Sequence, residues 1–475
     1  MTDALTPGSR FQSPFRSSNR TTRPIDSRLP TADSRSLLLK RGRVVDPATR
    51  LDCTGDVLVR DGLIVAISDA PLPPADDTVD CEGCIVSPGL IDLHVHFRDP
   101  DESGHHEETI ASGSAAAAAG GFTTVCCMPN TTPAIDACSV VDAIKHRATV
   151  VGLARVFPVA CGTIARRGET LAPILDLVEA GAIAISDDGE GIARSDMMKR
   201  ILGLVAAADS VFMQHCQDPT LTRGAAMNAG PLAARLGLGG WPREAEELML
   251  RRDLMLNRSV GARYHAQHLS VAESITALRE AREAGQPATG EASPHHLLLT
   301  EDACEQWDTA AKVNPPLRTR ADVEALKVGI AEGTITVLAT DHAPHPAQSK
   351  ETDFASASFG MVGLECAVPL YREALIDGGV LDWPAMLAMM TCEPAAVTGL
   401  ERLGLGRLEV GGPADVTIID PSAEWTIDPA TFRSAGRNCP FAGRRVRGRA
   451  IATIIGGAFT FRNTSPAVEG RAVVR

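Results

Sequence analysis

Apolar residues follow two spacings in the middle of the chain, between about residues 88 and 395. Short apolar runs alternate with segments whose apolar residues recur at helical spacing, a pattern typical of strand–helix repeats. The candidate strands are LIDLHVHF, FTTVCCMPN, RVFPVACG, AIAISDDG, SVFMQHC, RYHAQHLS, ATGEASPHH and ITVLATDHAP, and the helical segments include SVVDAIKHRA, TLAPILDLVEAG, RSDMMKRILGLVAAA and VAESITALREAREAG. Eight repeats predict a TIM (β/α)8 barrel over residues 88–395. A doubly wound sheet is the alternative, but no glycine-rich phosphate motif follows the first strand.

The two flanks of this region have a different pattern. Residues 37–87 and 396–475 contain short alternating strands separated by turn glycines, so we expect them to pair into one small β domain with the barrel inserted between its halves. Residues 1–36 are rich in Ser, Thr, Arg and Pro without apolar periodicity and are predicted to be a disordered tail. This tail has the composition of an organelle transit peptide but no amphipathic face.

Composition narrows the class of protein. The 475 residues carry 46 basic and 59 acidic side chains, a net charge of −13 that argues against nucleic-acid binding through bulk positive charge. No apolar run is long enough to cross a membrane, so we expect no membrane partner. The 12 cysteines lack regular spacing, which is typical of buried thiols in a reducing compartment. These features predict a cytoplasmic protein without a nucleic-acid or membrane partner.

Polar side chains that can bind metals collect where the predicted strands end. All 12 histidines lie between His94 and His345, and seven of the eight strands end in polar residues. Since barrel active sites are built at the carboxyl ends of strands, this pattern predicts a catalytic face. His94 and His96 are two residues apart on the first strand and therefore point to the same side. The other candidates are Asp187 and Asp188 on the fourth strand, His215 on the fifth, His265 and His268 on the sixth, and Asp341, His342 and His345 on the eighth.

Four histidines and two carboxylates from five strands can converge on two divalent metal ions. Nitrogen and oxygen ligands without thiolate favour catalytic zinc, and Asp188 has two oxygens with which to bridge the ions. Two zinc ions would make a bridging hydroxide at neutral pH and polarise a carbonyl, which is chemistry for attack on an amide or imide. Asp341 is the best-placed carboxylate for proton transfer.

Several longer motifs resemble a known family. These are PGLIDLHVHFRDP, GGFTTVCCMPNT, SDDG, HC, HLS, SPHHLLLTED, KVNPPLR, ATDHAPH, FGMVGLE and NCPFAGRRVRGRAIATIIGG, which extend from about residue 36 to 461. Together they resemble the dihydroorotases of the long bacterial (class I) type, in the amidohydrolase superfamily. One departure is Asp101, which stands where this family usually has a glycine after the motif arginine and proline.

The resemblance implies a role for particular residues. The implied ligands of two Zn²⁺ ions per subunit are His94, His96, Asp188, His215, His268 and Asp341. The implied substrate contacts are His96, Arg98, Asn130, Asn314, His345 and the backbone of Phe359 and Gly360. Asp341 is also the family's proton shuttle. The implied reaction is the reversible cyclisation of N-carbamoyl-L-aspartate to L-dihydroorotate in pyrimidine biosynthesis, with the metal-bridging hydroxide as nucleophile and Asp341 as general acid and base.

Two other functions compete with this hypothesis. Hydantoinases and allantoinases are related cyclic amidases that typically bridge their metals with a carboxylated lysine on the fourth strand, where this chain has Asp188 and no lysine. Some dihydroorotase-like chains have lost metal ligands and serve as non-catalytic partners of aspartate transcarbamoylase, whereas this chain has the full set. We expect a homodimer, and an association with aspartate transcarbamoylase is compatible with activity.

Overall fold

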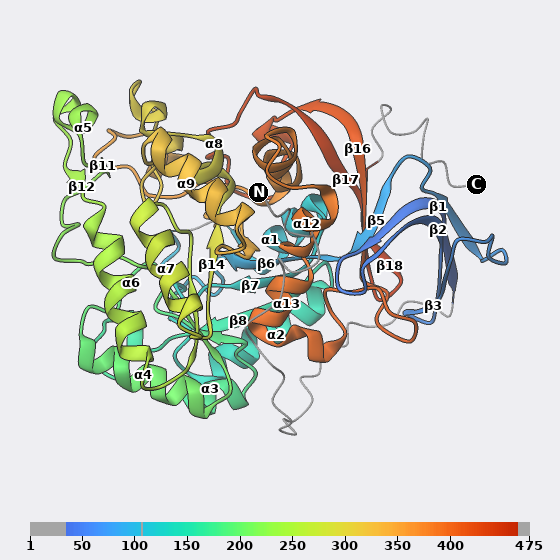
Figure 1. The fold of residues 1–475 in the computed structure, drawn as a ribbon, viewed down its shortest axis with the longest axis horizontal. Helices are drawn as coiled ribbons and strands as arrows, with labels where there is room; N and C mark the ends of the chain where they lie inside the picture. The colour runs from blue at the N-terminus through green and yellow to red at the C-terminus, as the bar shows by residue number, and fades with distance from the viewer. Residues whose placement is uncertain (1–34, 106–107, 464–475) are drawn as a thin grey trace, which may run out of the picture.

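The computed structural model describes residues 35–105 and 108–463. The predicted disordered tail lies outside the described residues except for Arg35 and Ser36. Figure 1 shows two bodies, a strand–helix barrel on the left and a smaller β domain on the right. The predicted fold class is therefore confirmed.

Eight parallel strands form the barrel, and each corresponds to one of the predicted apolar runs. In chain order they are β6 (Leu90–Val95), β7 (Phe122–Cys127), β8 (Arg155–Ala160), β9 (Ala184–Ile185), β10 (Val211–Gln214), β13 (Arg263–Ala266), β14 (Ala288–Ala292) and β15 (Val337–Leu338). Neighbouring strands pair in sequence order from β6 to β15. The barrel closes just beyond β15, where a parallel bridge joins Val95 to His342 and the amide of His96 donates to the His342 carbonyl.

Helices cover the outside of the barrel, as Figure 1 shows. They include one helix after each barrel strand: α1 (Ile110–Gly120), α2 (Cys138–Val151), α3 (Ile174–Glu179), α4 (Ser195–Ala207), α6 (Glu244–Asn257), α7 (Ala272–Glu283), α9 (Arg320–Ala331) and α11 (Ala367–Tyr371). In α4 the buried residues Met197, Met198, Ile201, Leu202 and Val205 recur at helical spacing and so form one apolar face toward the strands. The inside of the barrel holds a separate apolar cluster that includes Leu93, Met128, Val159 and Met213.

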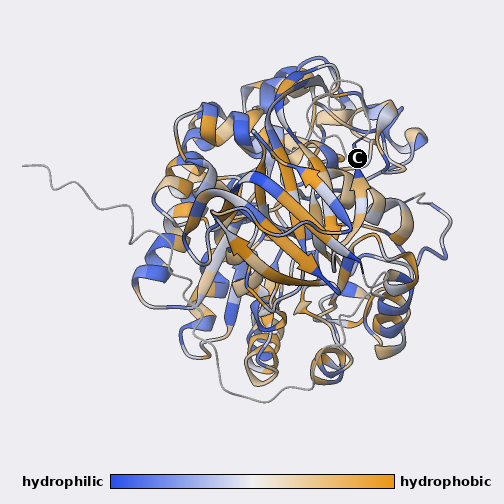
Figure 2. Cartoon of the chain, turned by 90° about the vertical axis from the view of Figure 1, so that its right-hand side faces the viewer, coloured by the Kyte–Doolittle hydropathy of each residue, from blue (hydrophilic) through white to orange (hydrophobic). Residues whose placement is uncertain are grey.

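The small β domain contains segments from both ends of the chain. Its strands are β1 (Ser36–Asp46), β2 (Leu51–Arg60), β3 (Leu63–Ser68), β4 (Asp77–Asp80), β5 (Ile85–Pro88), β16 (Val416–Thr426), β17 (Arg445–Ile455) and β18 (Ala458–Arg462). β5 from the first flank pairs antiparallel with β16 from the second, which joins the two halves into one sheet. Figure 2 looks onto this side and shows apolar colouring along the strands.

Shorter elements fill the connections. They are α5 (Pro231–Leu236), α8 (Pro294–Leu298), α10 (Ala347–Lys350), α12 (Trp383–Ala388), α13 (Cys392–Thr398), β11 (Met227–Asn228) and β12 (Gly240–Trp241). Within the described residues, none of the helices combines the length and the apolar character needed to cross a membrane.

Candidate metal centre

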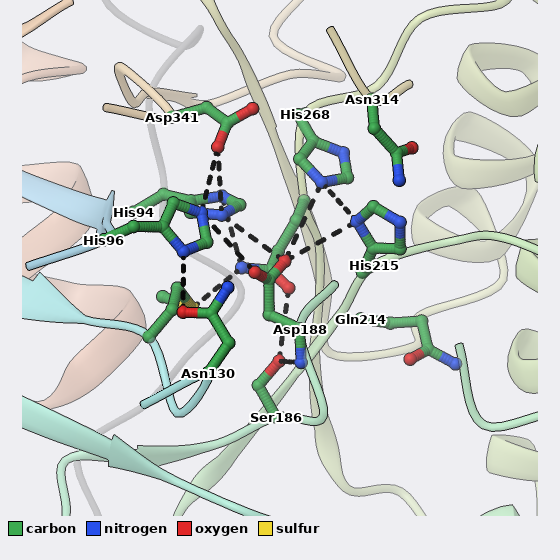
Figure 3. A network of polar contacts seen from close by, with 12 residues as sticks. His94, His96, Asn130, Ser186, Asp188, Gln214, His215, His268, Asn314 and Asp341 are labelled. Atoms are coloured by element: carbon green, nitrogen blue, oxygen red, sulfur yellow. Dashed lines mark hydrogen bonds and ion pairs between the residues drawn. The ribbon is translucent and has the colours of Figure 1, made fainter. Parts of the chain in front are cut away.

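The predicted metal ligands lie together at the carboxyl ends of the barrel strands. His94 is in β6 and His96 directly follows it, while Asp188, His215, His268 and Asp341 follow β9, β10, β13 and β15 within three residues. All six are at most 6% exposed. Five strands that are far apart in sequence therefore deliver six buried ligand-type side chains to one place (Figure 3).

Asp188 lies at the centre of this cluster. His94, His96 and Asp188 form one group in which a metal ion can find three ligand atoms, and Asp188, His215 and His268 form a second. Asp188 Oδ1 is 3.4 Å from His94 Nε2 and 3.5 Å from His215 Nδ1, and Oδ2 is 3.5 Å from His96 Nε2. Because one carboxylate is common to both groups, the arrangement has the form of a two-ion site with a bridging ligand.

Asp341 lies on the side of the first group. Its Oδ1 is 3.1 Å from His96 Nε2 and 3.5 Å from His94 Nε2. Figure 3 shows the carboxylate pointing down toward these two rings from the loop beyond β15. Asp341 can therefore bind a cation held by His94 and His96, or exchange protons with a molecule bound beside it.

Several ligand atoms of this cluster lack the partners that buried polar atoms normally have. Among the described residues, His94 Nε2 and Asp188 Oδ1 are buried without a hydrogen-bond partner. His215 Nδ1 lies 2.7 Å from His268 Nε2, a distance at which two lone pairs repel unless a proton or a cation lies beside them. Unpartnered buried polar atoms are costly, so the donor set fits divalent cations bound among these side chains.

Other side chains fix the orientation of the histidine rings. His96 Nδ1 donates to Asn130 Oδ1 at 2.9 Å, and His215 Nε2 donates to Gln217 Oε1 at 2.7 Å. In each case the second ring nitrogen, with its lone pair, faces Asp188. Metal-binding histidines typically use this kind of partner to hold their tautomer and ring direction.

Glu291, on β14, orients His94 in the same way and is absent from the residues predicted from the sequence. Its Oε1 accepts from His94 Nδ1 at 2.6 Å and its Oε2 accepts from His265 Nε2 at 3.0 Å. The backbone amide of His268 also donates to Oε1, at 3.1 Å. A carboxylate inside an otherwise apolar strand was a signal for this role, because a fully buried charge needs charged or hydrogen-bonding partners.

Electrostatics couples these groups strongly. Burial opposes the charged form of His94, but the carboxylates of Asp188, Glu291 and Asp341 outweigh burial and raise the pKa of His94 well above its usual value. Burial would raise the pKa of Glu291, yet His94 and His265 lower it to about 2. Burial likewise opposes ionisation of Asp188, and the surrounding histidines lower its pKa well below the usual range. The carboxylates of Asp188 and Glu291 are therefore ionised at neutral pH, and an ionised Asp188 can serve as a cation ligand.

The backbone is strained where these side chains leave the strands. Arg98, His268 and Asp341 have φ values of 55°, 30° and 51°, in the left-handed region that residues with a Cβ rarely adopt. Each such residue costs about 1 kcal/mol or more, and strain of this kind concentrates at functional sites.

The predicted substrate contacts Arg98, Asn130 and Asn314 surround the cluster. Arg98 is 8% exposed, and within the described part of the chain its buried Nε has no hydrogen-bond partner. Asn314 Nδ2 donates to Gln217 Oε1 at 3.0 Å, which leaves the buried Asn314 Oδ1 without a partner among the described residues. Both side chains therefore retain hydrogen-bonding capacity for a bound molecule.

The predicted contacts His345, Phe359 and Gly360 lie together beyond β15, where they bond to each other and to the chain. His345 Nε2 donates to the Phe359 carbonyl at 2.7 Å. The Gly360 amide donates to the Lys312 carbonyl, and the Gly360 carbonyl accepts from Lys350 Nζ at 3.0 Å. The Phe359 carbonyl and both backbone groups of Gly360 are therefore already hydrogen-bonded within the protein.

The other candidate ligands, Asp187, His265 and His342, form hydrogen bonds with the surrounding strands and loops. Asp187 accepts from the amides of Gly162 and Thr163 at 2.8 and 3.1 Å and so supports the loop after β8. His265 bonds to Thr289 and Glu291 on β14, and His342 Nδ1 accepts from the Gly363 amide. These three side chains brace the strand ends around the cluster.

Solved structures with the same architecture place this fold in a class. The L-hydantoinase (dihydropyrimidinase) from Arthrobacter aurescens superimposes with a TM-score of 0.82 at 26% identity, covering 90% of this chain and 96% of that one. The dihydropyrimidinase from Brevibacillus agri shares the fold with a TM-score of 0.79 at 21% identity. The barrel and the added β domain are thus those of an amidohydrolase.

Sequence relatives narrow the class to a family. A profile described as dihydro-orotase-like matches residues 83–274. The dihydroorotase of Geobacter sp. (strain M21) is 41% identical over 428 residues, which is 90% of this chain and 99% of the relative. The dihydroorotase of Pelotomaculum thermopropionicum is 44% identical over 421 residues, which is 89% of this chain and 97% of the relative. This chain belongs to the dihydroorotase family.

Proposed function

We propose that this protein is a zinc-dependent dihydroorotase, which interconverts N-carbamoyl-L-aspartate and L-dihydroorotate in pyrimidine biosynthesis. The observation that carries the proposal is the Asp188 carboxylate shared by two groups of buried histidines, in a chain 41–44% identical to dihydroorotases over nearly their whole length. The reaction opens or closes a cyclic amide and needs an activated water and a proton shuttle.

The ligands of two zinc ions would be His94, His96 and Asp341 on one side, His215 and His268 on the other, and Asp188 between them. Nitrogen and carboxylate ligands without thiolate suit a catalytic zinc site. Bound zinc would lower the pKa of a water molecule and polarise a carbonyl group.

Asp341 moves the proton in this mechanism. In the hydrolytic direction its carboxylate accepts a proton from the water that attacks the ring carbonyl next to the methylene carbon. It then delivers that proton to the ring nitrogen as the C–N bond breaks. In the synthetic direction the same carboxylate takes the proton from the carbamoyl nitrogen, and water leaves. Its position 3.1 Å from His96 Nε2 keeps this carboxylate at the edge of the cluster.

The substrate is held beside Asp341 by Arg98, Asn130, His345 and Asn314, of which Arg98 Nε and Asn314 Oδ1 have no hydrogen-bond partner among the described residues. The Arg98 guanidinium binds the ring carboxylate, because a planar fork of N–H donors matches two carboxylate oxygens. Asn130 and His345 flank the same carboxylate, and the unpartnered Asn314 Oδ1 accepts a ring N–H.

Hydantoinase activity is the rival proposal, since the structural neighbours carry that name. Their identity to this chain is 26% or less, against 41–44% for the dihydroorotases, and the side chain shared by the two histidine groups is Asp188 rather than a lysine. A substrate panel of dihydroorotate, hydantoin and allantoin separates the two, with zinc quantified in the same preparation. We expect turnover of dihydroorotate in both directions and about two zinc ions per subunit; preference for hydantoin would refute the proposal.

We also propose that the enzyme is a cytoplasmic homodimer and that it is active without aspartate transcarbamoylase. The complete ligand set supports activity of the isolated chain. Light scattering gives the oligomeric state, and copurification with aspartate transcarbamoylase tests the association. A zinc-loaded chain that is inactive alone and active in that complex would contradict the proposal.

A further inference from the structure

A second arginine, Arg166, reaches the cluster from the loop after β8. Its Nη1 donates to the backbone carbonyl of Asp188 at 2.9 Å. The same nitrogen is 3.3 Å from the point that a Cβ on Gly189 would occupy, and Asn130 Nδ2 is 3.7 Å from that point. The guanidinium of Arg166 and the amide of Asn130 therefore border one small region beside Asp188.

Arg166 has donors that the protein does not use. Within the described residues, the one hydrogen bond of its side chain is the bond to the Asp188 carbonyl, and its buried Nε has no partner. Five N–H donors on a planar cation match carboxylate oxygens well. A partly buried arginine with unused donors is thus suited to an anion that arrives with the ligand.

The loop holds Arg166 in a conformation that costs energy. Ala165 and Arg166 both have positive φ, 53° and 58°, although neither is glycine. Asp136 accepts from the Ala165 amide at 2.8 Å, and Asp187 accepts from two amides earlier in the loop. Two carboxylates therefore stabilise a strained turn whose result is to direct the side chain toward Asp188.

Arg98 lies near enough for the two positive charges to interact. Burial is the main reason that the pKa of Arg98 falls to about 10, and the charge of Arg166 contributes to the decrease. Both guanidinium groups have a buried Nε without a partner in the described part of the chain. The carboxylates of Asp188 and Asp341 oppose this decrease in the pKa of Arg98, and an anion bound between the two guanidinium groups would use the donors that the protein leaves free.

We propose that Arg166 binds the substrate carboxylate together with Arg98 and selects cyclic ureides that carry this group. The inference rests on the proposed function, because the carboxylate in question is that of dihydroorotate and N-carbamoyl-L-aspartate. Arg166 comes from a different loop than Arg98, so the carboxylate would be held from two sides.

The experiment compares the zinc-loaded wild type with Arg166→Gln, Arg166→Lys and the matched control Arg167→Gln. Arg167 is the next residue, is exposed and lies outside the site, so its substitution controls for loop charge. For each protein we would measure kcat and KM for dihydroorotate, zinc content, and the Kd for orotate, an unreactive ring carboxylate, by calorimetry. We expect Arg166→Gln to raise both KM and Kd by about 10–100-fold, with kcat and zinc content nearly unchanged.

The remaining outcomes separate ligand binding from a structural role. The KM and Kd of Arg166→Lys should lie between those of wild type and Arg166→Gln, because lysine keeps the positive charge but lacks the planar set of N–H donors. Unchanged KM and Kd in Arg166→Gln would overturn the inference. So would a joint loss of zinc and kcat at unchanged Kd, which would show that Arg166 only supports the Asp188 backbone. If the wild type binds orotate but does not turn over dihydroorotate, the proposed function fails while the calorimetry still tests Arg166; a wild type that does neither refutes both.

Discussion

The two ends of the barrel differ in how their buried arginines are paired. At the end where the strands begin, Arg155 of β8 donates to both oxygens of Asp415, at 2.6 and 3.1 Å, and both residues are buried. At the end where the strands finish, Arg98 and Arg166 have a buried Nε without a partner among the described residues. The Arg155–Asp415 ion pair links the barrel to the β domain, whereas the unused donors of Arg98 and Arg166 mark a place where a ligand can supply acceptors.

The backbone shows the same difference. At the beginning of the strands, the left-handed residue after α1 is Gly121, and a Cβ there would lie 2.8 Å from Ala450 and Thr417 atoms. At the other end, Arg98, His268 and Asp341 adopt positive φ despite their side chains. At these positions Gly121 packs closely without strain, whereas Arg98, His268 and Asp341 accept strain that aims functional groups.

The largest expected effect is the loss of activity in Asp341→Asn. The amide cannot accept and return the proton, so we expect kcat for dihydroorotate to fall by about 10²–10⁴-fold, with the urea unfolding midpoint almost unchanged. Glu351→Gln, an exposed neutral substitution in the same loop region, is the control and should retain full activity. An active Asp341→Asn enzyme would show that Asp341 is not the proton shuttle.

At the end of the barrel where the strands begin, a substitution should lower stability and leave activity unchanged. Asp415→Asn leaves the Arg155 guanidinium buried without its counter-charge, so we expect a loss of about 3–5 kcal/mol in the free energy of unfolding. The kcat and KM of the molecules that remain folded should match the wild type. Urea denaturation measures the free energy of unfolding, and kinetics at low temperature measures kcat and KM. A stable Asp415→Asn protein with impaired turnover would contradict the division between the two ends.

Glu291→Gln tests whether a carboxylate behind the cluster acts through His94. The amide is a weaker acceptor for His94 Nδ1, and we expect zinc affinity to fall by about 10–100-fold in a chelator competition assay. Asp253→Asn is the matched control, because Asp253 is equally buried but bonds to Gln214 and Tyr264, outside the histidine cluster. Equal zinc affinity in wild type and Glu291→Gln would show that the contact is structural only.

The sequence predicted the strands and the cluster because both depend on local spacing. The alternation in LIDLHVHF places His94 and His96 on one face, and each later ligand follows an apolar run that became a barrel strand. The choice between Asp187 and Asp188 was out of reach of spacing alone, since adjacent residues after a strand differ only in which way the loop turns. In the structure Asp187 is held by the amides of Gly162 and Thr163, whereas Asp188 lies beside the histidines.

Arg166 and Glu291 were not predicted from the sequence, for two different reasons. Arg166 reaches the cluster only because Ala165 and Arg166 both have left-handed backbone, which no residue type in ARRG signals. Glu291 pairs with His94, 197 residues away, and that pairing depends on barrel closure. The sequence nevertheless showed a glutamate within the predicted strand that contains ATGEA. A charged residue inside a predicted barrel strand is therefore worth treating as a candidate partner of the metal ligands.

The smallest expected effect concerns a buried carboxyl at the end where the strands begin. Glu393 in α13 is 7% exposed, and burial raises its pKa from 4.5 to about 7, with Arg282 partly opposing the rise. Between these pH values the Glu393 side chain keeps a proton in the folded chain that it releases in the unfolded chain, so its contribution to stability is greatest below pH 4.5 and is lost as pH rises through 7. Relative to Glu393→Gln, we expect the wild type to lose on the order of 1–2 kcal/mol between pH 5 and 8. Urea denaturation across this range measures the difference, with the exposed Glu283→Gln as control. Because Glu393 lies at the end of the barrel where the strands begin, away from the metal centre, kcat should be the same in all three proteins at each pH. A changed pH profile of kcat in Glu393→Gln would show that the two ends are coupled.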